Sequence, residues 1–515
     1  MRPGHGEDSA PAPDDRTGTP ETPEPRKTAG ATESSKSPKA SKASKTPEAP
    51  ETPGSGTAED TGRTSMFSSL RIRNYRIFAM GQAVSNTGTW MQRIAQDWLV
   101  LSLTGSATAV GITTALQFLP MLLFGLWGGV IADRCAKRKV LFVTQSVMGL
   151  TGLALAALTL SGHVHVVHVY VLAFALGLAT VVDNPTRQTF VAEMVGPDQL
   201  RNAVSLNSAN FQSARLVGPA VAGVLITAVG SGWAFLLNGL SFLAPLAGLL
   251  LMRTSELYPS ERAPRTKGQL REGLSYVRAR PELLWPIVLV GFIGTFGYNF
   301  PIWLTAFTDR VFESGAGTYG LLNSLMAVGS VTGALLAARR ASSRMRLMVG
   351  AALLFGLLMA VAAVTPSFWL FAALMLPIGA MGLTFNVTAN ASVQLASDPL
   401  MRGRVMSLYM MVFVGGTPIG GPIMGWITDS HGARAGLLAG ALISALVAVA
   451  VGFALARASG LRLRVYVGRG RRGLVFEPRE PGEPREPGEP GEPHDAAADA
   501  SGKGGGERAR VAPVA

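Results

Sequence analysis

Residues 107–161 read ATAVGITTALQFLPMLLFGLWGGVIADRCAKRKVLFVTQSVMGLTGLALAALTLS. Two apolar runs, at about 107–132 and 139–161, lie on either side of a short connection that is rich in Arg and Lys. A helix of about 20 apolar residues crosses the ~30 Å hydrocarbon core of a bilayer and satisfies its own backbone hydrogen bonds there. The stretch therefore predicts two transmembrane helices joined by a basic turn.

Twelve apolar runs of this kind occur between Tyr75 and Arg457. The predicted spans are 75–102, 107–132, 139–161, 167–190, 203–229, 232–252, 284–308, 317–338, 346–365, 367–391, 404–428 and 433–457. Nearly all Lys and Arg residues of the short connections fall in every second connection, and such connections lie in the cytoplasm by the positive-inside rule. We therefore expect an all-α membrane protein with 12 transmembrane helices in the plasma (inner) membrane and both termini in the cytoplasm.

The basic composition fits the same topology. The 515 residues carry a net charge of +13, and the basic residues flank the apolar runs, where anionic lipids attract them. We therefore expect the lipid bilayer, and not nucleic acid, as the partner of these charges. The chain has no G-x-x-x-x-G-K-[ST] phosphate loop and no nucleophile constellation, and His163, His165 and His168 are interpreted as an ordinary outer turn. We expect no enzyme activity, no cofactor and no metal.

Composition divides the chain into five parts. They are a disordered cytoplasmic N-terminal tail at 1–65, a six-helix half at 66–252, a cytoplasmic linker at 253–283, a second six-helix half at 284–457, and a disordered Pro/Glu/Arg-rich tail at 458–515. The linker has Leu270, Leu274 and Val277 at helical spacing, which predicts an amphipathic helix on the inner membrane surface.

The two halves resemble each other in sequence. Residues 109–112 have a counterpart at 318–321, and Gly177 recurs as Gly379 at an offset of 202 residues. Related halves predict a pseudo-twofold axis along the membrane normal, a binding cavity between the halves near the midplane, and alternating access by rocking of one half against the other.

The connection after the second span carries a recognisable motif. It runs from Gly129 to Lys139 and resembles the G-x-x-x-D-R-x-G-R-[RK] hallmark of the major facilitator superfamily, with Ala136 at the second glycine position. The resemblance implies the major facilitator fold and a conformational latch, in which Asp133 lies against the N-terminus of the eleventh helix and holds the outward-open state. The latch residues are Gly129, Asp133, Arg134, Lys137 and Arg138.

A second block is more specific. It starts with Asp183-Asn184-Pro185-Thr186-Arg187-Gln188 and continues through Arg215-Leu216-Val217-Gly218-Pro219 to Phe235-Leu236-Leu237-Asn238. Over about residues 66–457 the chain is similar to the branch with the enterobactin exporter, the "transmembrane secretion effector" proteins and macrolide-efflux-like proteins. This resemblance implies export of a small molecule in exchange for protons.

Gly218, Pro219 and Gly223 form a helix-bend motif that resembles the G-P-x-x-G-G antiporter motif of drug exporters. Small residues and a proline allow a helix to bend and to pack closely, so a plain packing motif remains an alternative. This superfamily often carries an arginine in its fourth helix, four residues before a glycine. Here Ala173 occupies that position before Gly177.

Charged residues inside the spans are candidates for coupling or substrate binding. A charge at membrane depth costs roughly 2.5–3.5 kcal/mol and needs a partner or a purpose. Arg93 and Asp97 are spaced to pair on one helix face, and Arg187 follows Asp183 by one turn. We expect Arg215, the deepest of the five, to attract an anionic substrate group, and Asp183 to carry the coupling proton.

The sequence favours a secondary active transporter that exports amphipathic small molecules of the drug, antibiotic or siderophore type, in exchange for protons, as a functional monomer. Two alternatives stay open. An uptake carrier or a lysophospholipid flippase would have the same fold, and a membrane scaffold or receptor would act through its tails.

Overall fold

The computed structural model describes residues 67–258, 269–338, 345–458, 461–468 and 471–478, except for some side chains within them, among which is that of Asp133. Within this part of the chain, ten helices are long and apolar enough to cross a membrane. The all-α prediction for the membrane region is confirmed, and the protein is a multi-pass membrane protein.

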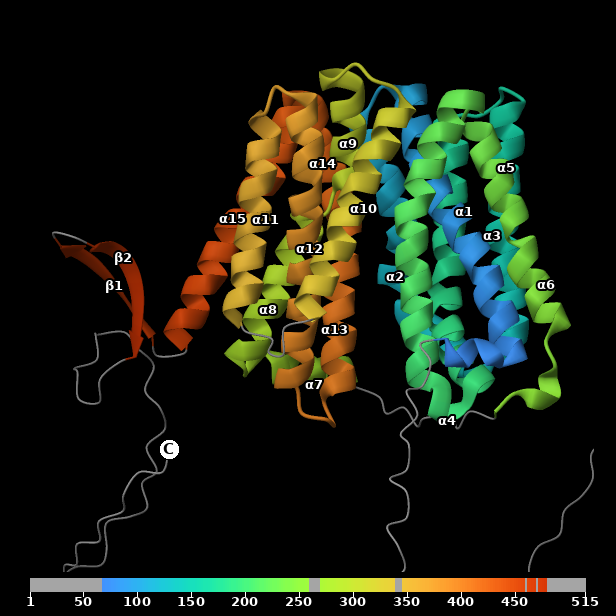
Figure 1. Cartoon of the computed structure of the whole chain (residues 1–515), viewed down its shortest axis with the longest axis horizontal. Helices are drawn as coiled ribbons and strands as arrows, with labels where there is room; N and C mark the ends of the chain where they lie inside the picture. The colour runs from blue at the N-terminus through green and yellow to red at the C-terminus, as the bar shows by residue number, and fades with distance from the viewer. Residues whose placement is uncertain (1–66, 259–268, 339–344, 459–460, 469–470, 479–515) are drawn as a thin grey trace, which may run out of the picture. The chain divides into compact units, whose positions relative to one another are not determined.

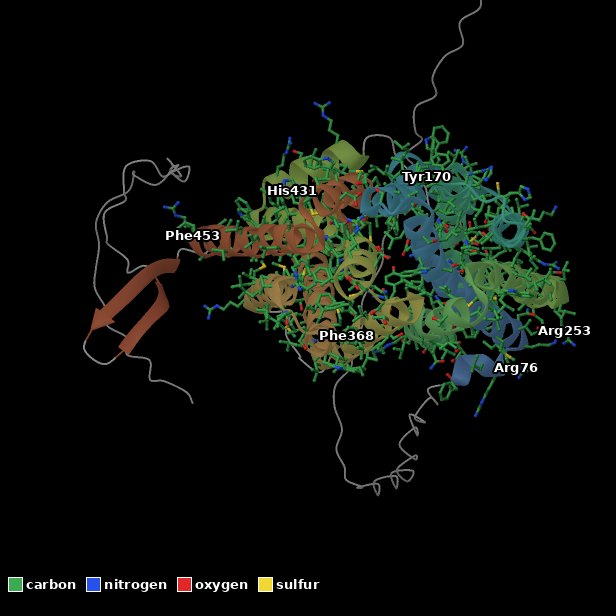
Figure 2. The ribbon with its side chains drawn as sticks, turned by 90° about the horizontal axis from the view of Figure 1, so that it is seen from above. Arg76, Tyr170, Arg253, Phe368, His431 and Phe453 are labelled. Atoms are coloured by element: carbon green, nitrogen blue, oxygen red, sulfur yellow. The ribbon has the colours of Figure 1, made fainter. Side chains whose placement is uncertain are left out.

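The first half is built from six helices (Figure 1). They are α1 (Arg73–Thr104), α2 (Ala107–Arg134), α3 (Lys137–Leu160), α4 (Val166–Val229), α5 (Ser231–Ser241) and α6 (Leu243–Leu251). The second half contains α8 (Pro281–Phe292), α9 (Phe300–Ala306), α10 (Ala316–Ala338), α11 (Met345–Val364), α12 (Phe368–Ala396), α13 (Arg402–Gly415), α14 (Thr417–His431) and α15 (Ala433–Ala458). Seen from above, the halves lie side by side, with Arg76, Tyr170 and Arg253 in one and Phe368 and His431 in the other (Figure 2).

Helix α4 has 64 residues, about three times the length that crosses a bilayer. It folds back at Gly196, whose φ of 69° and ψ of 178° are not helical, directly before Pro197. Its two arms correspond to the predicted spans 167–190 and 203–229. The helix α1 is long but not among the ten apolar ones, because polar side chains interrupt it. The count of twelve spans therefore stays a prediction.

The two ends of the helices differ in composition. We call "basic end" the end with Cys135 between α2 and α3, Gly196 in α4, and Arg402 at the start of α13. The "Ser106 end" holds Ser106 before α2 and Gly432 between α14 and α15.

Equivalent contacts occur in both halves, as the repeat predicts. A Cβ atom at Gly177 of α4 would lie 2.5 Å from the carbonyl oxygen of Gln117 in α2. A Cβ atom at Gly379 of α12 would overlap the carbonyl oxygen of Met326 in α10 in the same way. Gly177 thus lets the first arm of α4 lie directly against the backbone of α2, and Gly379 lets α12 lie against α10 in the same way.

The interiors of the halves differ. The second half has an aromatic core in which the Phe307 and Phe371 rings stack 4.6 Å apart beside the buried Trp303. The first half buries many amide side chains, among them Gln82, Gln92, Gln145 and Asn238, whereas the buried polar residues of the second half are mostly Ser and Thr. Buried polar groups need hydrogen-bond partners, so the polar interior marks the first half as the place to look for a site.

The linker forms α7 (Gln269–Arg278), at the position of the predicted amphipathic helix. This helix is fastened to the second half, because Glu272 forms an ion pair with Arg404 and Tyr276 donates a hydrogen bond of 2.7 Å to Asp398. Val277 is buried, whereas Leu274 is exposed. Helix α7 therefore contacts the second half of the protein, in addition to the membrane surface that the sequence predicts.

Two strands follow α15, within the stretch 458–515 that the sequence predicts to be disordered. Strand β1 (Leu461–Gly468) pairs with β2 (Arg471–Pro478) in an antiparallel hairpin. Apolar and basic residues alternate in Leu461-Arg462-Leu463-Arg464-Val465, and this period of two favours a strand. Disorder of the stretch 458–515 stays a prediction. The remainder of the tail, like 1–65, lies outside the described residues.

Candidate functional site

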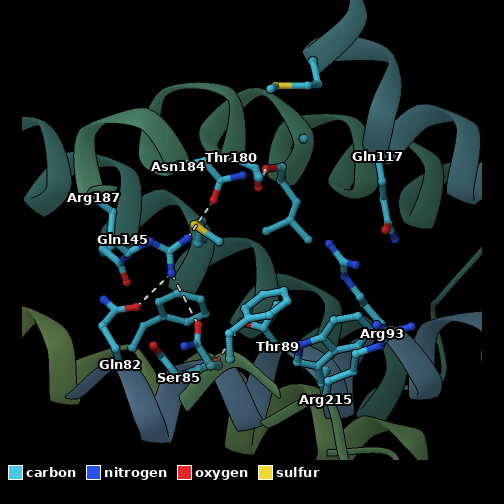
Figure 3. Close-up of a pocket in the computed structure, with 18 of the residues that line it drawn as sticks. Gln82, Ser85, Thr89, Arg93, Gln117, Gln145, Thr180, Asn184, Arg187 and Arg215 are labelled. Carbon is cyan, nitrogen blue, oxygen red and sulfur yellow. Dashed lines mark hydrogen bonds between the residues drawn. The ribbon is translucent and has the colours of Figure 1, made fainter. Parts of the chain in front are cut away.

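The candidate site is a cavity of about 310 Å³ inside the first half (Figure 3). Helices α1, α2, α3 and α4 supply nearly all of its lining, and Val414 of α13 is the lining residue from the second half. Neutral polar side chains face it, as do three arginines. The lining residues that matter below are Gln82, Ser85, Asn86, Thr89, Trp90, Arg93, Gln117, Phe118, Asn184, Arg187, Phe211 and Arg215.

The cavity continues toward the basic end. A second compartment of about 410 Å³ shares Asn86, Asn184, Arg187 and Phe211 with the first. Its other lining residues are Gln188, Asn207, Ser208 and Gln212. The last three precede Arg215 on the second arm of α4, which rises from the turn at Gly196, so the cavity extends toward the basic end.

The Ser106 end is closed by close contacts between the halves. Helices α2 and α14 run antiparallel, and a Cβ atom at Gly111 would overlap the carbonyl oxygen of Gly421. On the other side of the pseudo-twofold axis, a Cβ atom at Gly320 of α10 would lie 2.6 Å from the carbonyl oxygen of Pro219 in α4. These are equivalent contacts in the repeat, and both need glycine because backbone meets backbone.

Asp429, near the end of α14, adds a polar clasp at the Ser106 end. Its carboxylate accepts hydrogen bonds from the backbone N–H groups of Ala107 (2.9 Å) and Thr108 (2.8 Å), and from the hydroxyls of Ser106 (2.7 Å) and Thr108 (2.6 Å). Arg310 forms an ion pair of 2.6 Å with the same carboxylate. These N–H groups belong to the first turn of α2, where a helix carries unsatisfied donors and partial positive charge. In the sequence, Asp429 follows the predicted span 404–428 directly, and no local pattern predicts this role.

Asp97 also joins the halves. The hydroxyl of Tyr319 in α10 donates a hydrogen bond of 2.9 Å to Asp97 in α1. In the described part of the chain no ion pair joins Arg93 to Asp97, although they are one turn apart. The pairing that their spacing suggested is therefore not formed, because the two side chains leave α1 for different surroundings: Asp97 turns to the other half and Arg93 turns into the cavity.

Arg93 and Arg215 meet at one end of the cavity (Figure 3). The guanidinium carbon of Arg93 lies 5.0 Å from the centroid of the Trp90 ring, and that of Arg215 lies 5.7 Å from it. Arg93 also lies 5.6 Å from the Phe118 ring, and its buried Nε–H has no partner among the described residues. Cation–π contacts contribute about 0.5–2 kcal/mol each. The two contacts of Arg93 are together of the same order as the cost of an unpaired charge at membrane depth, roughly 2.5–3.5 kcal/mol on the insertion scale, and they leave its Nε–H without an acceptor.

Arg187 lies at the other end of the cavity and, unlike Arg93, is balanced. It forms an ion pair of 2.9 Å with Asp183, one turn earlier in α4, as the sequence predicts. Its guanidinium also donates to Gln82 (2.9 Å) and Asn184 (2.8 Å). Asp183 is fully buried and accepts further hydrogen bonds from Thr144 (2.9 Å) and Gln145 (2.8 Å). All of these partners belong to the first half.

The latch residues lie at the basic end, away from the cavity. The side chain of Asp133 is outside the described set, and Arg134 is exposed. Lys137 forms an ion pair with Glu193 of α4, and Arg138 donates a hydrogen bond of 2.7 Å to the carbonyl of Leu249 in α6. These basic residues are thus held within the first half. The glycine in tight contact with α4 is Gly128, where a Cβ would meet Val181, next to the predicted Gly129.

The helix-bend motif contacts two helices. A Cβ atom at Gly218 would lie 2.5 Å from the Cβ of Trp90 in α1, and one at Gly223 would lie 3.2 Å from Gly320 in α10. Inside α4, non-helical backbone angles occur at Gly196 and not at Pro219. The motif therefore serves close packing here, and a bend at Pro219 stays a prediction.

Sequence reasoning found the three arginines but missed the neutral polar lining. Gln82, Asn86, Thr89 and Arg93 follow one another at spacings of three or four residues, so they form one face of α1. A polar stripe of this kind within an apolar span was the available signal. Among the aromatic residues of the spans, Trp90 and Phe118 line the cavity, whereas Trp127 is 68% exposed and Trp303 is buried in the second half.

Comparison with known proteins places these features in context. A family model described as "transmembrane secretion effector" matches residues 64–461. The "Multidrug efflux pump Tap" of Mycolicibacterium fortuitum is 26% identical over 69% of this chain and 89% of its own length. The "Staphyloferrin A transporter" of Staphylococcus aureus is 25% identical over 47% of this chain, and the alignment spans 62% of that transporter. The "Macrolide efflux protein A" of Streptococcus pyogenes is 23% identical over 45% of this chain and 57% of its own length.

Solved structures share the fold. A bacterial homologue of the human lysosomal transporter Spinster, in an inward-facing and unoccupied conformation, has a TM-score of 0.62 at 14% identity and covers 74% of this chain and 97% of its own. The nucleoside transporter NupG has a TM-score of 0.58 at 13% identity and covers 74% of this chain and 99% of its own. At these identities the similarity concerns the fold alone.

Proposed function

Since the chain belongs to the transmembrane secretion effector family of the major facilitator superfamily, we propose that it is a secondary active transporter that exports amphipathic small molecules of the drug, antibiotic or siderophore type in exchange for protons. It works by alternating access as a monomer in the plasma membrane. Its basic end and both termini face the cytoplasm.

The observation that carries this proposal is a polar cavity whose described lining extends toward the basic end, while contacts between the halves close the other end. The cavity lies beside α1 to α4 and extends toward the basic end, while the Asp429 clasp and the Gly111 contact close the Ser106 end. A transporter that has just released its solute outward, or that awaits the next one from the cytoplasm, has this arrangement. The aromatic rings and neutral amides of the lining suit a solute with both apolar and polar parts.

Proton coupling requires a carboxylate whose surroundings change when the halves rock. The partners of Asp183, namely Thr144, Gln145 and Arg187, belong to its own half and move with it. The partner of Asp97, Tyr319, belongs to the other half, and their hydrogen bond has to break when the Ser106 end opens. We therefore favour Asp97 over Asp183 as the coupling group.

The test is accumulation of a panel of dyes, antibiotics and siderophores in an efflux-deficient bacterium, with and without the full chain. We expect the intracellular level of at least one compound to fall severalfold, and a protonophore to restore that level while ATP is held constant. A raised level would favour the uptake carrier. Movement of a fluorescent lysophospholipid between leaflets, without change in the panel, would favour the flippase. No change in either would favour a scaffold.

A further inference from the structure

Arg93 and Arg215 are two cations at one end of the cavity, and Asp97, one turn after Arg93, attracts Arg93 only from beyond ion-pair distance. Neither has an ion-pair partner among the described residues, and neither compartment has an Asp or Glu in its described lining. The charge of Arg187 is balanced by Asp183, at 2.9 Å. Arginine stays protonated at any accessible pH, so two positive charges remain around the Trp90 ring.

We propose that the transported solute carries a carboxylate, or an anionic group of similar shape, which binds between Arg93 and Arg215. This proposal rests on the exporter function proposed above and names its substrate class. A carboxylate accepts two parallel hydrogen bonds from one guanidinium, and such charge-assisted bonds are roughly twice as strong as neutral ones. It would also give the buried Nε–H of Arg93 the partner that it lacks.

The rest of the lining defines the remainder of the solute. Trp90, Phe118 and Phe211 give the cavity an aromatic surface beside the two arginines. Gln82, Ser85 and Asn184 lie at the end near Arg187, where they offer neutral donors and acceptors (Figure 3). The expected solute is therefore an anion with a ring-containing apolar body and an uncharged hydrogen-bonding group away from the anionic end.

A matched set of probes tests this charge preference. Naphthoate, naphthamide and naphthylmethylamine share one aromatic body and differ in charge. Binding of tritiated naphthoate to the full chain in lipid nanodiscs is measured by scintillation proximity, with empty nanodiscs subtracted, and the unlabelled compounds serve as competitors. We expect saturable binding of naphthoate and competition at least tenfold weaker from the amide and the amine.

Variants connect the preference to the two arginines. Arg215→Gln and Arg93→Gln should each weaken naphthoate binding at least tenfold, and Arg215→Lys should recover part of it. Arg346→Gln removes an exposed arginine of α11 and should leave binding unchanged. Equal competition by the amine, no saturable naphthoate binding, or full binding in both Gln variants would overturn the proposal. Export of cationic dyes with no preference for the anion would overturn it while leaving the exporter function intact.

A second inference comes from the Ser106 end and does not depend on the cavity. We infer that Asp429 is a latch for the conformation that is closed at this end. Four hydrogen bonds join its carboxylate to Ser106, Ala107 and Thr108 of the other half, and Arg310 of its own half forms an ion pair with it. In the repeat, the position equivalent to Asp429 is Thr227, whose hydroxyl donates a hydrogen bond of 2.8 Å to the carbonyl of Gly223 in its own helix and lies next to Gly317 of α10. The polar clasp therefore exists at one of the two equivalent interfaces.

The latch is tested by the distance across the Ser106 end. Spin labels at His163 and Pro366, which are exposed and belong to different halves, are introduced into the full chain with Cys135 replaced by Ser. We expect Asp429→Asn and Asp429→Ala to shift the electron–electron distance distribution to longer values. Asp309→Asn, beside Arg310 and exposed, is the matched control and should not shift it. An unchanged distribution in Asp429→Ala would overturn the inference.

Discussion

Tyr319 of α10 donates a hydrogen bond of 2.9 Å to Asp97 of α1, and these two residues belong to different halves of the protein. Protonation of Asp97 removes a negative charge from the acceptor of this bond and weakens it. On the proposal that Asp97 carries the coupling proton, its protonation and the closure of the Ser106 end are linked through this one contact.

The first prediction separates Asp97 from Asp183. Asp97→Asn should lower the rate of export driven by a pH gradient in inside-out vesicles at least tenfold. It should retain solute counterflow, because counterflow needs no net proton movement. Asp183→Asn should instead lower thermal stability, because Arg187 would lose its buried partner at a cost of about 3–5 kcal/mol. If Asp183→Asn lost gradient-driven export with normal stability and counterflow, and Asp97→Asn kept it, the coupling group would be Asp183.

The second prediction concerns Gly111. A Cβ atom there would overlap the backbone of Gly421 in the other half, so Gly111→Ala should hold the Ser106 end apart and reduce export severely while the protein still reaches the membrane. Gly403→Ala is the control, since a Cβ at this helical glycine of α13 meets nothing within 4 Å. Normal export by Gly111→Ala would mean that α2 and α14 do not approach this closely.

The third prediction concerns the opposite latch. Asp133→Asn removes the negative charge that the family resemblance assigns to the N-terminus of the eleventh helix. We expect export to fall severely at normal membrane levels, and the basic end to become more accessible to thiol reagents at Cys135. Export at the rate of the unsubstituted protein would mean that the motif is only a charged turn.

The fourth prediction concerns orientation. Cys135 is the single cysteine of the chain and is exposed at the basic end. An impermeant maleimide should label it in inside-out vesicles and not in intact cells, because the positive-inside rule places this connection in the cytoplasm. Labelling in intact cells would invert the proposed topology, and with it the direction of export.

Sequence periodicity and charge were sufficient for the helices but not for their partners. The break between predicted spans at 190 and 203 corresponds to a turn at Gly196, because Gly and Pro there stop the helix whatever surrounds it. Arg93 and Asp97 show what spacing in the sequence could not predict. Their spacing allows a pair, yet Tyr319, more than 200 residues away, takes Asp97. The role of Asp429 could not be predicted, because it depends on contact with the N-terminus of α2. No local sequence pattern reveals that contact.

Nearly the whole lining of the cavity comes from the first half, with Val414 as the contribution of the second. In the proposed alternating-access cycle, a solute bound there would stay with the first half while the second half moves relative to it. Recognition of the solute would then depend on the first half, and gating would depend on movement of the second half. A chimera joined in the linker before α7, with the first half from this protein and the second from a relative, would inherit the solute preference of the first half.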